Sequence, residues 1–496
     1  MTSLWIDRSG TLETDPFEPG ARVDDVVVGA GLTGLTTAVL LARAGRRVTV
    51  LEARSVGVVA TGRSTAKLSL LQGSQLQQIA SRNTRGVLQA YVDGNRAAQT
   101  WMLDWAAGAG IDVQRRTAYS YAGTDSGVST VLREQAVAES TGLPVYRTTT
   151  PELPYSTRAA VALDDQAQFD PMDVLRGLAA ELRSLGGRLV TGVRVTGVDS
   201  SHDPVDVRTD HGGIRAEHVV LATGSPVLDR GLYWAKLKPQ RSYALAFTAP
   251  QTLPQGMYLS VDSPTRSVRS APGDHDGERL IIGGNGHTVG RASSPAALVD
   301  ELTDWTLARW PGAQRTHAWS AQDYEAPQRI PFVGIMPRTN RRVSLATGYD
   351  KWGMTNAVAA ALTIVGDRLG DTPDWARTLH HRVTLPLALA EGIGANLAVG
   401  WWYARGWART LATPLPQSRP AEGEGVTGRR GIRPVAVSTV DGRTCELSAL
   451  CPHLHAVLNW NDQERTWDCP AHGSRFAADG ALLEGPATRD LRPAGR

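Results

Sequence analysis

Residues 25–52 read DVVVGAGLTGLTTAVLLARAGRRVTVLE, and this stretch decides the fold expected for most of the chain. An apolar run, Val26–Val28, leads into a turn with three glycines, and an apolar helical segment continues to Ala44. A second apolar run, Val48–Leu51, ends at Glu52. The order of strand, glycine turn, helix, strand and acid predicts a parallel βαβ unit that binds a dinucleotide. The alternative is an ordinary βαβ unit with a glycine turn.

Each glycine of the turn has a physical role in this prediction. Gly29 makes the tight turn, Gly31 lets the backbone approach a pyrophosphate, and Gly34 lets the helix pack closely on the strand. The phosphates then lie at the positive end of the helix, and the acid is placed to bind a ribose hydroxyl. The residues expected at this part of the site are Gly29, Ala30, Gly31, Leu32, Thr33, Gly34, Glu52 and Ala53.

Bulk properties restrict the remaining possibilities. At 496 residues, the chain is long enough for about two to four domains with substantial cores. Its net charge of +3 gives no support for a nucleic-acid partner. Three cysteines are too few for a disulfide framework. The N-terminal MTSLWIDRSG has neither a signal-peptide pattern nor twin arginines, so we expect a cytoplasmic enzyme.

Three later segments are expected to meet the same dinucleotide. Residues 56–73, VGVVATGRSTAKLSLLQG, are polar and leave the βαβ unit directly, although a surface loop is the alternative. The apolar strand in EHVVLATGSP, residues 217–226, breaks at a small-residue turn. Residues 343–369 repeat strand, glycine turn and apolar helix, and a helix N-terminus there can receive negative charge from a reduced ring. A plain strand–helix connection is the alternative for this last segment. The contacts expected from these segments and the strand around 188–198 are Arg63, Ser64, Thr65, Lys67, Val195, Ala222, Thr223, Gly224, Gly348, Tyr349, Trp352, Gly353, Met354 and Thr355.

Two stretches resemble a second dinucleotide turn and a membrane span, respectively, but we assign neither role. Residues 281–290, IIGGNGHTVG, resemble a second dinucleotide turn, but no helical segment opens behind them, and we interpret them as a strand end. Residues 383–409 are apolar and near the length of a membrane span, but they contain Glu391 and Asn396. We expect a helix docked between domains or touching a membrane surface, followed by a Pro-rich linker over 412–425.

Near the C-terminus, two short loops contain a metal-binding pattern. Cys451 and His453 form a C-x-H pair, and after fifteen intervening residues Cys469 and His472 form a C-x-x-H pair. Two thiolates and two imidazoles suit a [2Fe–2S] cluster with two Cys on one iron and two His on the other. Zinc would accept the same ligands, but a one-residue gap fits its usual spacing poorly. The pattern therefore predicts an iron–sulfur cluster, which leaves Cys445 as a thiol without a ligand role.

These loops resemble the Rieske domain, and the resemblance extends through Gly473–Phe476 and through Gly485-Pro486-Ala487, which is similar to the family's proline loop. High-potential respiratory members carry an extra Cys in each loop, whereas this chain has Ala456 and Ala471. The Ser that raises the potential in that family is matched by Ser474, but Phe476 replaces its Tyr. We therefore expect a potential below the top of the range of roughly −150 to +300 mV.

Residues 1–370 resemble the D-amino-acid-oxidase-like (DAO) flavoprotein superfamily, on VVVGAGLTGLTTA, HVVLATGS and ATGYDKWGMT. More narrowly, TGRSTAK, GLYWAKLKPQRSYAL, SAQDY, IPFVG and KWGMTN resemble bacterial FAD oxidoreductases with a C-terminal Rieske domain. The resemblance implies FAD as the dinucleotide. Arg63 stands where these relatives are expected to have a His, and no Cys lies near the flavin segments, so we expect non-covalent FAD.

The resemblance implies an α/β (α+β) two-lobed FAD-binding fold of the D-amino-acid-oxidase/glutathione-reductase type, followed by a small all-β Rieske domain. The oxidoreductase is expected over residues 1–382, the helical segment and linker over 383–424, and the Rieske domain over 425–496. Within the oxidoreductase, we expect the dinucleotide-binding lobe at about 20–75, 150–230 and 335–372. The substrate lobe is expected at about 76–149 and 231–334.

The expected activity is removal of a hydride from a small organic substrate, with a C–N bond of an amine or amino acid implied by the superfamily. Electrons would pass singly from FAD to the cluster, with an external electron-carrier protein or quinone as possible partner. The alternatives are entry of electrons at the cluster from an external reductase, an electron-transfer module, and an oxidase whose cluster is structural or redox-sensing. Residues expected to face the flavin are Arg241 and Tyr243, as ligands of a substrate carboxylate, together with His287, Tyr324, Lys351 and Trp352.

Overall fold

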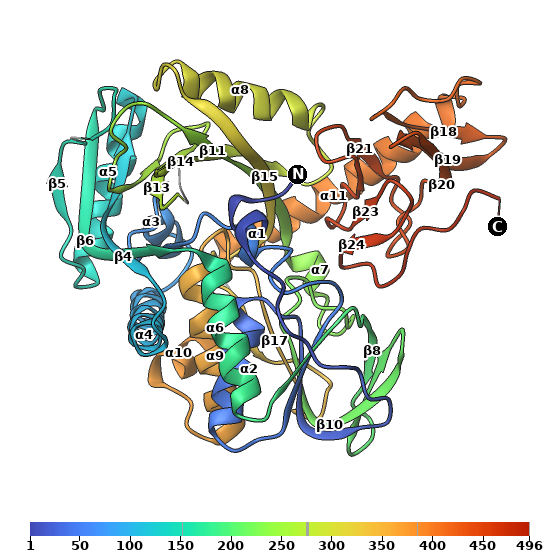
Figure 1. Cartoon of the computed structure of the whole chain (residues 1–496), viewed down its shortest axis with the longest axis horizontal. Coiled ribbons are helices and arrows are strands. Elements are labelled where there is room, and N and C mark those ends of the chain that lie inside the picture. The colour runs from blue at the N-terminus through green and yellow to red at the C-terminus, as the bar shows by residue number, and fades with distance from the viewer. Residues whose placement is uncertain (151, 274–276, 384, 496) are drawn as a thin grey trace.

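A computed structural model describes residues 1–150, 152–273, 277–383 and 385–495. Figure 1 shows a larger body built around two sheets and a smaller C-terminal body of short strands. A long helix, α11 (Pro386–Ala412), connects the two bodies. This arrangement confirms the predicted two-lobed α/β fold followed by a small all-β domain.

The first sheet has the strand order β16-β17-β10-β1-β2-β7, with β9 and β8 added beside β10. Its strands are β1 (Arg22–Val28), β2 (Val48–Glu52), β7 (Arg188–Thr191), β8 (Val195–Asp199), β9 (Val205–Thr209), β10 (Gly212–Leu221), β16 (Phe332–Ile335) and β17 (Val343–Thr347). The pairs that join β17, β10, β1, β2 and β7 are all parallel. Parallel strands are buried on both faces, which is why β1 and β2 are apolar runs without alternation.

The register of this sheet brings the ends of its parallel strands to one edge. Val28 pairs with both Leu51 and Leu221, and Leu221 pairs with Leu345. The turns that follow β1, β2, β10 and β17 therefore open into the same crevice, where ligands bind in open parallel sheets.

Helices cover this sheet and supply the crossovers that parallel strands require. They are α2 (Leu32–Arg43), α4 (Arg85–Ala109), α6 (Pro171–Ser184), α9 (Gly353–Leu369) and α10 (Asp374–His380). α2 contacts α6 on one side and α9 on the other (Figure 1). α6 begins where the Asp170 side chain accepts a hydrogen bond from the Met172 N–H, and the pyrrolidine of Pro171 fits the first helical position.

The second sheet has the order β15-β11-β14-β13-β12-β4-β6-β3, and β5 adds to β6. Its strands are β3 (Lys67–Leu68), β4 (Val113–Ala122), β5 (Tyr146–Thr148), β6 (Ala159–Phe169), β11 (Lys238–Thr248), β12 (Met257–Ser260), β13 (Arg266–Ala271), β14 (Arg279–Thr288) and β15 (Gln314–Glu325). The helices α3 (Gln75–Ala80), α5 (Asp125–Ser140) and α8 (Pro295–Leu307) belong to this lobe. The stretch 281–290 is largely the end of β14, as interpreted from the sequence.

Two strands depart from the expected lobe boundaries. β6 lies within the range 150–230, and β3 lies within 20–75, yet both strands pair in the second sheet. The chain crosses between the lobes at these points, so residues on β3 face the crevice from the opposite side to the glycine turn.

The C-terminal body contains a three-stranded sheet, β18-β19-β20, and a four-stranded sheet, β21-β22-β23-β24. The strands are β18 (Gly425–Arg430), β19 (Arg433–Val440), β20 (Arg443–Ser448), β21 (Asn459–Asn461), β22 (Thr466–Asp468), β23 (Arg475–Ala477) and β24 (Leu482–Glu484). Leu458, Trp467 and Phe476 are fully buried in its own core. Across the described ranges, no helix is both long and apolar enough to cross a bilayer.

Candidate functional site

The glycine turn after β1 leaves no room for side chains. Gly29 has a φ of +105°, and a Cβ there would lie 2.5 Å from the carbonyl oxygen of Ala222. A Cβ on Gly34 would lie 1.9 Å from the carbonyl oxygen of Gly29. The close approach of α2 to the turn thus requires glycine at both positions, as a dinucleotide-binding turn does.

Glu52 is fixed at the end of β2 beside this turn. One carboxylate oxygen accepts the backbone N–H of Ala30 at 2.9 Å, and the other accepts the N–H of Arg54 at 2.9 Å. The carboxylate lines the crevice and retains lone pairs for a further donor. It therefore meets the geometric requirement for binding a ribose hydroxyl.

The crevice is a cavity of about 690 Å³ that both lobes enclose. Most of the residues expected at the dinucleotide line it: Gly29, Gly31, Leu32, Thr33, Glu52, Ala53, Arg63, Ser64, Thr65, Lys67, Val195, Ala222, Thr223, Gly224, Tyr349, Trp352, Gly353 and Met354. Ala30, Gly34, Gly348 and Thr355 lie behind this wall. The Thr33 hydroxyl and the Tyr349 hydroxyl lie 2.7 Å apart, which joins the first turn of α2 to the loop that precedes α9.

The residues expected to face the flavin separate into two groups. Tyr243, Tyr324, Lys351 and Trp352 line the cavity, whereas Arg241 and His287 do not. His287 Nε2 lies 3.0 Å from the Tyr243 hydroxyl.

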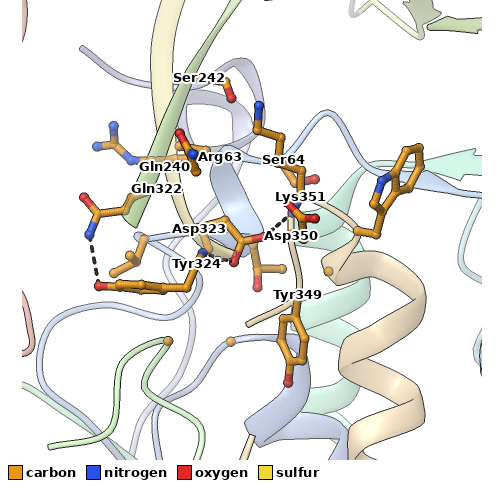
Figure 2. Close-up of a pocket in the computed structure, with 18 of the residues that line it drawn as sticks. Arg63, Ser64, Gln240, Ser242, Gln322, Asp323, Tyr324, Tyr349, Asp350 and Lys351 are labelled. Atoms are coloured by element: carbon orange, nitrogen blue, oxygen red, sulfur yellow. Dashed lines mark hydrogen bonds between the residues drawn. The ribbon is translucent and has the colours of Figure 1, made fainter. Parts of the chain in front are cut away.

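The Arg241 side chain is buried and fully engaged elsewhere. Its guanidinium donates to Ser320 Oγ at 2.6 Å, to Gln322 Oε1 at 2.7 Å and to Glu464 at 2.6 Å. Its neighbours on β11, Gln240 and Ser242, line the cavity instead (Figure 2). The geometry thus does not favour Arg241 as the ligand of a substrate carboxylate.

Asp323 is a cavity residue that sequence reasoning missed. Its carboxylate accepts the backbone N–H of Tyr324 at 2.7 Å and that of Lys351 at 2.5 Å (Figure 2). Burial raises the pKa of Asp323 to about 7, despite these two hydrogen bonds. Asp350 and Lys351 have φ values of +49° and +70°, so the turn that they form is strained. The hydrogen bond from the Lys351 N–H to Asp323 holds this turn in place. The only sequence signal was its position before Tyr324 in the quoted motif SAQDY.

Lys67 enters the cavity from β3 without a carboxylate partner in the described parts of the chain. Its ammonium group donates to the Tyr258 carbonyl at 3.0 Å and to the Ser267 hydroxyl. Burial, with a contribution from the nearby Arg269, lowers the pKa of Lys67 to about 7. This side chain can therefore exchange a proton near neutral pH.

The four predicted cluster ligands meet at the tips of two loops. Cys451 and Cys469 are each 1% exposed, and the rings of His453 and His472 lie 5.2 Å apart between centroids. Both ring nitrogens of His472 are buried without a hydrogen-bond partner. Within the described residues no three such side chains converge as ligands of one metal ion. The thiols pair with each other and the imidazoles with each other, so the donor set fits a [2Fe–2S] cluster with two Cys and two His.

The loop around Cys469 stabilises the thiolate form of this residue. A hydrogen bond shared with Cys451 holds the pKa of Cys469 below its usual value, and backbone N–H groups of Ala471, His472 and Gly473 act in the same direction. Burial lowers the pKa of His472 to about 3, which keeps the imidazole neutral, as a metal ligand must be.

The C-terminal body completes the wall of the cavity. Leu483, Glu484, Gly485 and Ala487 line it together with residues of the two lobes. The Tyr324 hydroxyl donates to the Gly485 carbonyl at 3.2 Å, and this contact joins the cavity to the proline loop.

A second contact leads from the cavity to the ligand loop. The Gln322 amide donates to the Tyr324 hydroxyl at 3.0 Å (Figure 2). It also donates to the Gly473 carbonyl at 2.8 Å. Gly473 directly follows the cluster ligand His472. The side chains of Tyr324 and Gln322 therefore connect the cavity wall to a ligand loop of the cluster.

A buried ion cluster holds the same interface. Glu464 pairs with Arg241 at 2.6 Å, with Arg63 at 3.3 Å and with Arg475. Burial acts to raise the pKa of Glu464, but the arginines Arg475, Arg241 and Arg63 outweigh it and hold that pKa at about 2. Arg63 itself lies in the loop expected at the flavin, so the ion cluster connects that loop directly to the C-terminal body.

Trp234 covers the histidines of the cluster loops. The indole of this residue, on α7 (Tyr233–Lys236), lies 5.3 Å from the His453 ring and 4.8 Å from the His472 ring. The indole N–H donates to Asp229 at 2.6 Å, which fixes its orientation. The imidazole edge therefore faces the oxidoreductase body.

Comparison with known proteins identifies both parts of the chain. The family model described as DAO, FAD dependent oxidoreductase, matches residues 24–366, and the Rieske [2Fe-2S] domain model matches residues 415–494. The Rieske 2Fe-2S iron–sulfur protein YhfW of Bacillus subtilis is 28% identical over 496 aligned residues, covering 99% of this chain and 97% of the relative.

Solved structures agree with this assignment of the fold. Glycine oxidase from Geobacillus kaustophilus has a TM-score of 0.60 at 20% identity, covering 71% of this chain and 96% of that chain. L-proline dehydrogenase from P. horikoshii has a TM-score of 0.59 at 18% identity, covering 72% and 96%. The cofactors are those of the two matched families, FAD and a [2Fe–2S] cluster. The chain thus belongs to the DAO family of FAD-dependent oxidoreductases and carries a Rieske [2Fe–2S] domain at its C-terminal end.

Proposed function

We propose that this oxidoreductase oxidises a C–N bond of a small amino acid and passes the electrons one at a time to its own Rieske cluster. The observation that carries the proposal is the shared wall of the cavity, which contains residues of the flavin lobes and Leu483, Glu484, Gly485 and Ala487 of the Rieske domain. When bound, FAD accepts a hydride as two electrons, and a [2Fe–2S] cluster takes one electron at a time.

The contacts at this wall support an internal route for the electrons. Tyr324 and Gln322 connect the cavity to the carbonyl groups of Gly485 and Gly473 through hydrogen bonds. The Trp234 indole packs against the rings of His453 and His472, so this edge of the cluster loops faces the oxidoreductase body. This arrangement supports electron transfer between the cavity and the cluster within one chain.

The polar groups of the cavity favour a substrate with a carboxylate. Lys351 Nζ and Ser242 Oγ meet at Gly286, where an added Cβ would lie 2.6 Å from the first and 3.5 Å from the second. No salt bridge to Lys351 occurs within the described residues, so its charge is available to a ligand. Glycine oxidase and L-proline dehydrogenase, which share the fold, are named for amino-acid substrates. We assign Lys351 and Ser242 to the substrate carboxylate and Lys67 to proton exchange at the opposite wall.

The substrate assignment is tested by anaerobic flavin bleaching with small amino acids and with amines of the same skeleton that lack the carboxylate. Lys351→Met should raise KM for the amino acid about 10- to 100-fold, the loss expected for a charge-assisted hydrogen bond. Lys236→Met, at an exposed lysine outside the cavity, serves as the control. Equal bleaching by amino acids and amines, unchanged in Lys351→Met, would contradict the assignment.

A further inference from the structure

Helix α11 is attached to the protein along one face only. Ala388 is 1% exposed, and Glu391 pairs with Arg82 of the substrate lobe. The Asn396 amide donates to the Ala235 carbonyl at 2.9 Å, and the Trp407 indole donates to the His455 carbonyl at 3.1 Å. The acidic and amide side chains that argued against a membrane span in the sequence thus bind other parts of the protein.

The opposite face of α11 is apolar and unpartnered in the described structure. Successive residues rotate by about 100° around an α-helix, so Leu397 lies roughly 180° from the buried Ala388. Its side chain is 71% exposed. Among the side chains of this helix that the structure describes, the other large apolar ones that are exposed are Leu387, Ile393, Trp401 and Leu411.

Only positive charge accompanies this apolar face. Glu391 is the single acid of α11 and is engaged with Arg82, whereas Arg405 and Arg409 are exposed. The Arg405 guanidinium lies 5.0 Å from the centre of the Trp401 ring, so a cation borders the exposed indole.

A second exposed element adjoins the C-terminal end of the helix. The Arg429 N–H donates to the Thr413 carbonyl at 2.9 Å, which places the β18–β19 turn just beyond α11. Ile432 at the tip of this turn is 86% exposed, and the exposed Arg433 follows it. An apolar side chain flanked by basic residues is therefore repeated at the end of the helix.

We propose that the outer face of α11, with the Ile432 turn at its end, binds the surface of an anionic lipid bilayer, with the helix lying in the interface rather than crossing it. Apolar side chains enter the acyl boundary while arginines reach lipid phosphates, and indole rings favour the headgroup level. A second copy paired through the same face would offer Arg405 and Arg409 no acidic partner, whereas anionic lipids do.

The test is co-sedimentation of the full-length holoprotein with vesicles of phosphatidylcholine alone and of phosphatidylcholine with phosphatidylglycerol. The protein should bind the anionic vesicles preferentially, and high salt should weaken that binding. Leu397→Glu should weaken binding at least about tenfold, and R405Q/R409Q should weaken it about 25-fold, roughly fivefold for each arginine. Leu185→Glu, at an exposed leucine outside α11, should bind like the wild type.

The flavin and cluster spectra of each variant identify any loss of fold. If Leu397→Glu perturbs these spectra, the vesicle binding of R405Q/R409Q decides the test, since this variant removes charge without placing an acid on the helix. Failure of the wild type to bind anionic vesicles, or equal binding to neutral ones, would overturn the proposal. Concentration-dependent dimerisation that Leu397→Glu abolishes, without vesicle binding, would assign the face to a second copy instead.

Discussion

Glu464→Gln should loosen the Rieske domain from the oxidoreductase body. The carboxylate is 5% exposed and is shared by Arg63, Arg241 and Arg475, two of which belong to the flavin lobes. Glutamine keeps the shape but removes the charge, so the variant leaves three buried guanidinium groups without their common counter-ion. Breaking one side of a buried ion pair typically costs about 3–5 kcal/mol.

The pKa of Glu464 gives an independent magnitude. It is held at about 2, against an ordinary value of 4.5. At about 1.36 kcal/mol per pKa unit, the ionised form is favoured in the folded protein by roughly 3 kcal/mol. Because the folded pKa is depressed, this stabilisation is complete above about pH 4.5 and is lost as the pH falls toward 2. The difference between wild type and variant should shrink over the same range.

Denaturant unfolding measures this effect when the cluster and the flavin are followed separately. Near neutral pH, Glu464→Gln should lower the free energy of unfolding by roughly 3 kcal/mol in the cluster signal. The control is Glu446→Gln, because Glu446 forms a surface pair with Arg430 on the same domain and is 44% exposed. That change should cost less than about 1 kcal/mol. The reasoning is refuted if the two variants are equally stable.

Three further outcomes follow from the sites. Gly34→Ala should abolish FAD binding, because its Cβ would lie 1.9 Å from the Gly29 carbonyl oxygen; flavin content of the purified protein measures this, and a normally loaded variant would contradict the packing. Cys469→Ser should remove the Rieske EPR signal while flavin absorbance remains, and a retained signal would sink the ligand assignment. Asp323→Asn should remove a pH-dependent change of the flavin spectrum near pH 7, since burial raises the pKa of Asp323 to about 7 and the carboxyl loses its proton above that pH. A titration with the same midpoint in both proteins would assign the change to another group.

The parts of the site that sequence could predict are those encoded locally. The glycine turn, its helix and Glu52 form one continuous stretch, and each glycine has a steric reason that the structure reproduces at Gly29 and Gly34. The Cys and His pairs are likewise complete within two short loops. In both cases the residues that bind the cofactor lie close together in the sequence, so the kind of cofactor can be predicted without knowledge of tertiary contacts.

Long-range partners account for what the sequence could not predict. Arg241 was expected at the substrate, but its partner Glu464 lies 223 residues away in another domain. A shift of one residue along β11 places Gln240 or Ser242 at the cavity in place of Arg241. The alternation of residues in the sequence does not tell which face of the strand meets the cavity. Asp323 acquires its raised pKa from burial and its role from Lys351, 28 residues further on.

In the proposed reaction, electrons from a substrate at FAD reach the cluster within the same chain. Anaerobic stopped-flow with an amino acid that bleaches the flavin tests it most directly, with cluster absorbance followed at several protein concentrations. Flavin bleaching should be followed by cluster reduction, at a first-order rate that does not depend on protein concentration. A cluster that stays oxidised while the flavin is reduced, or that is reduced at a rate proportional to protein concentration, would contradict it.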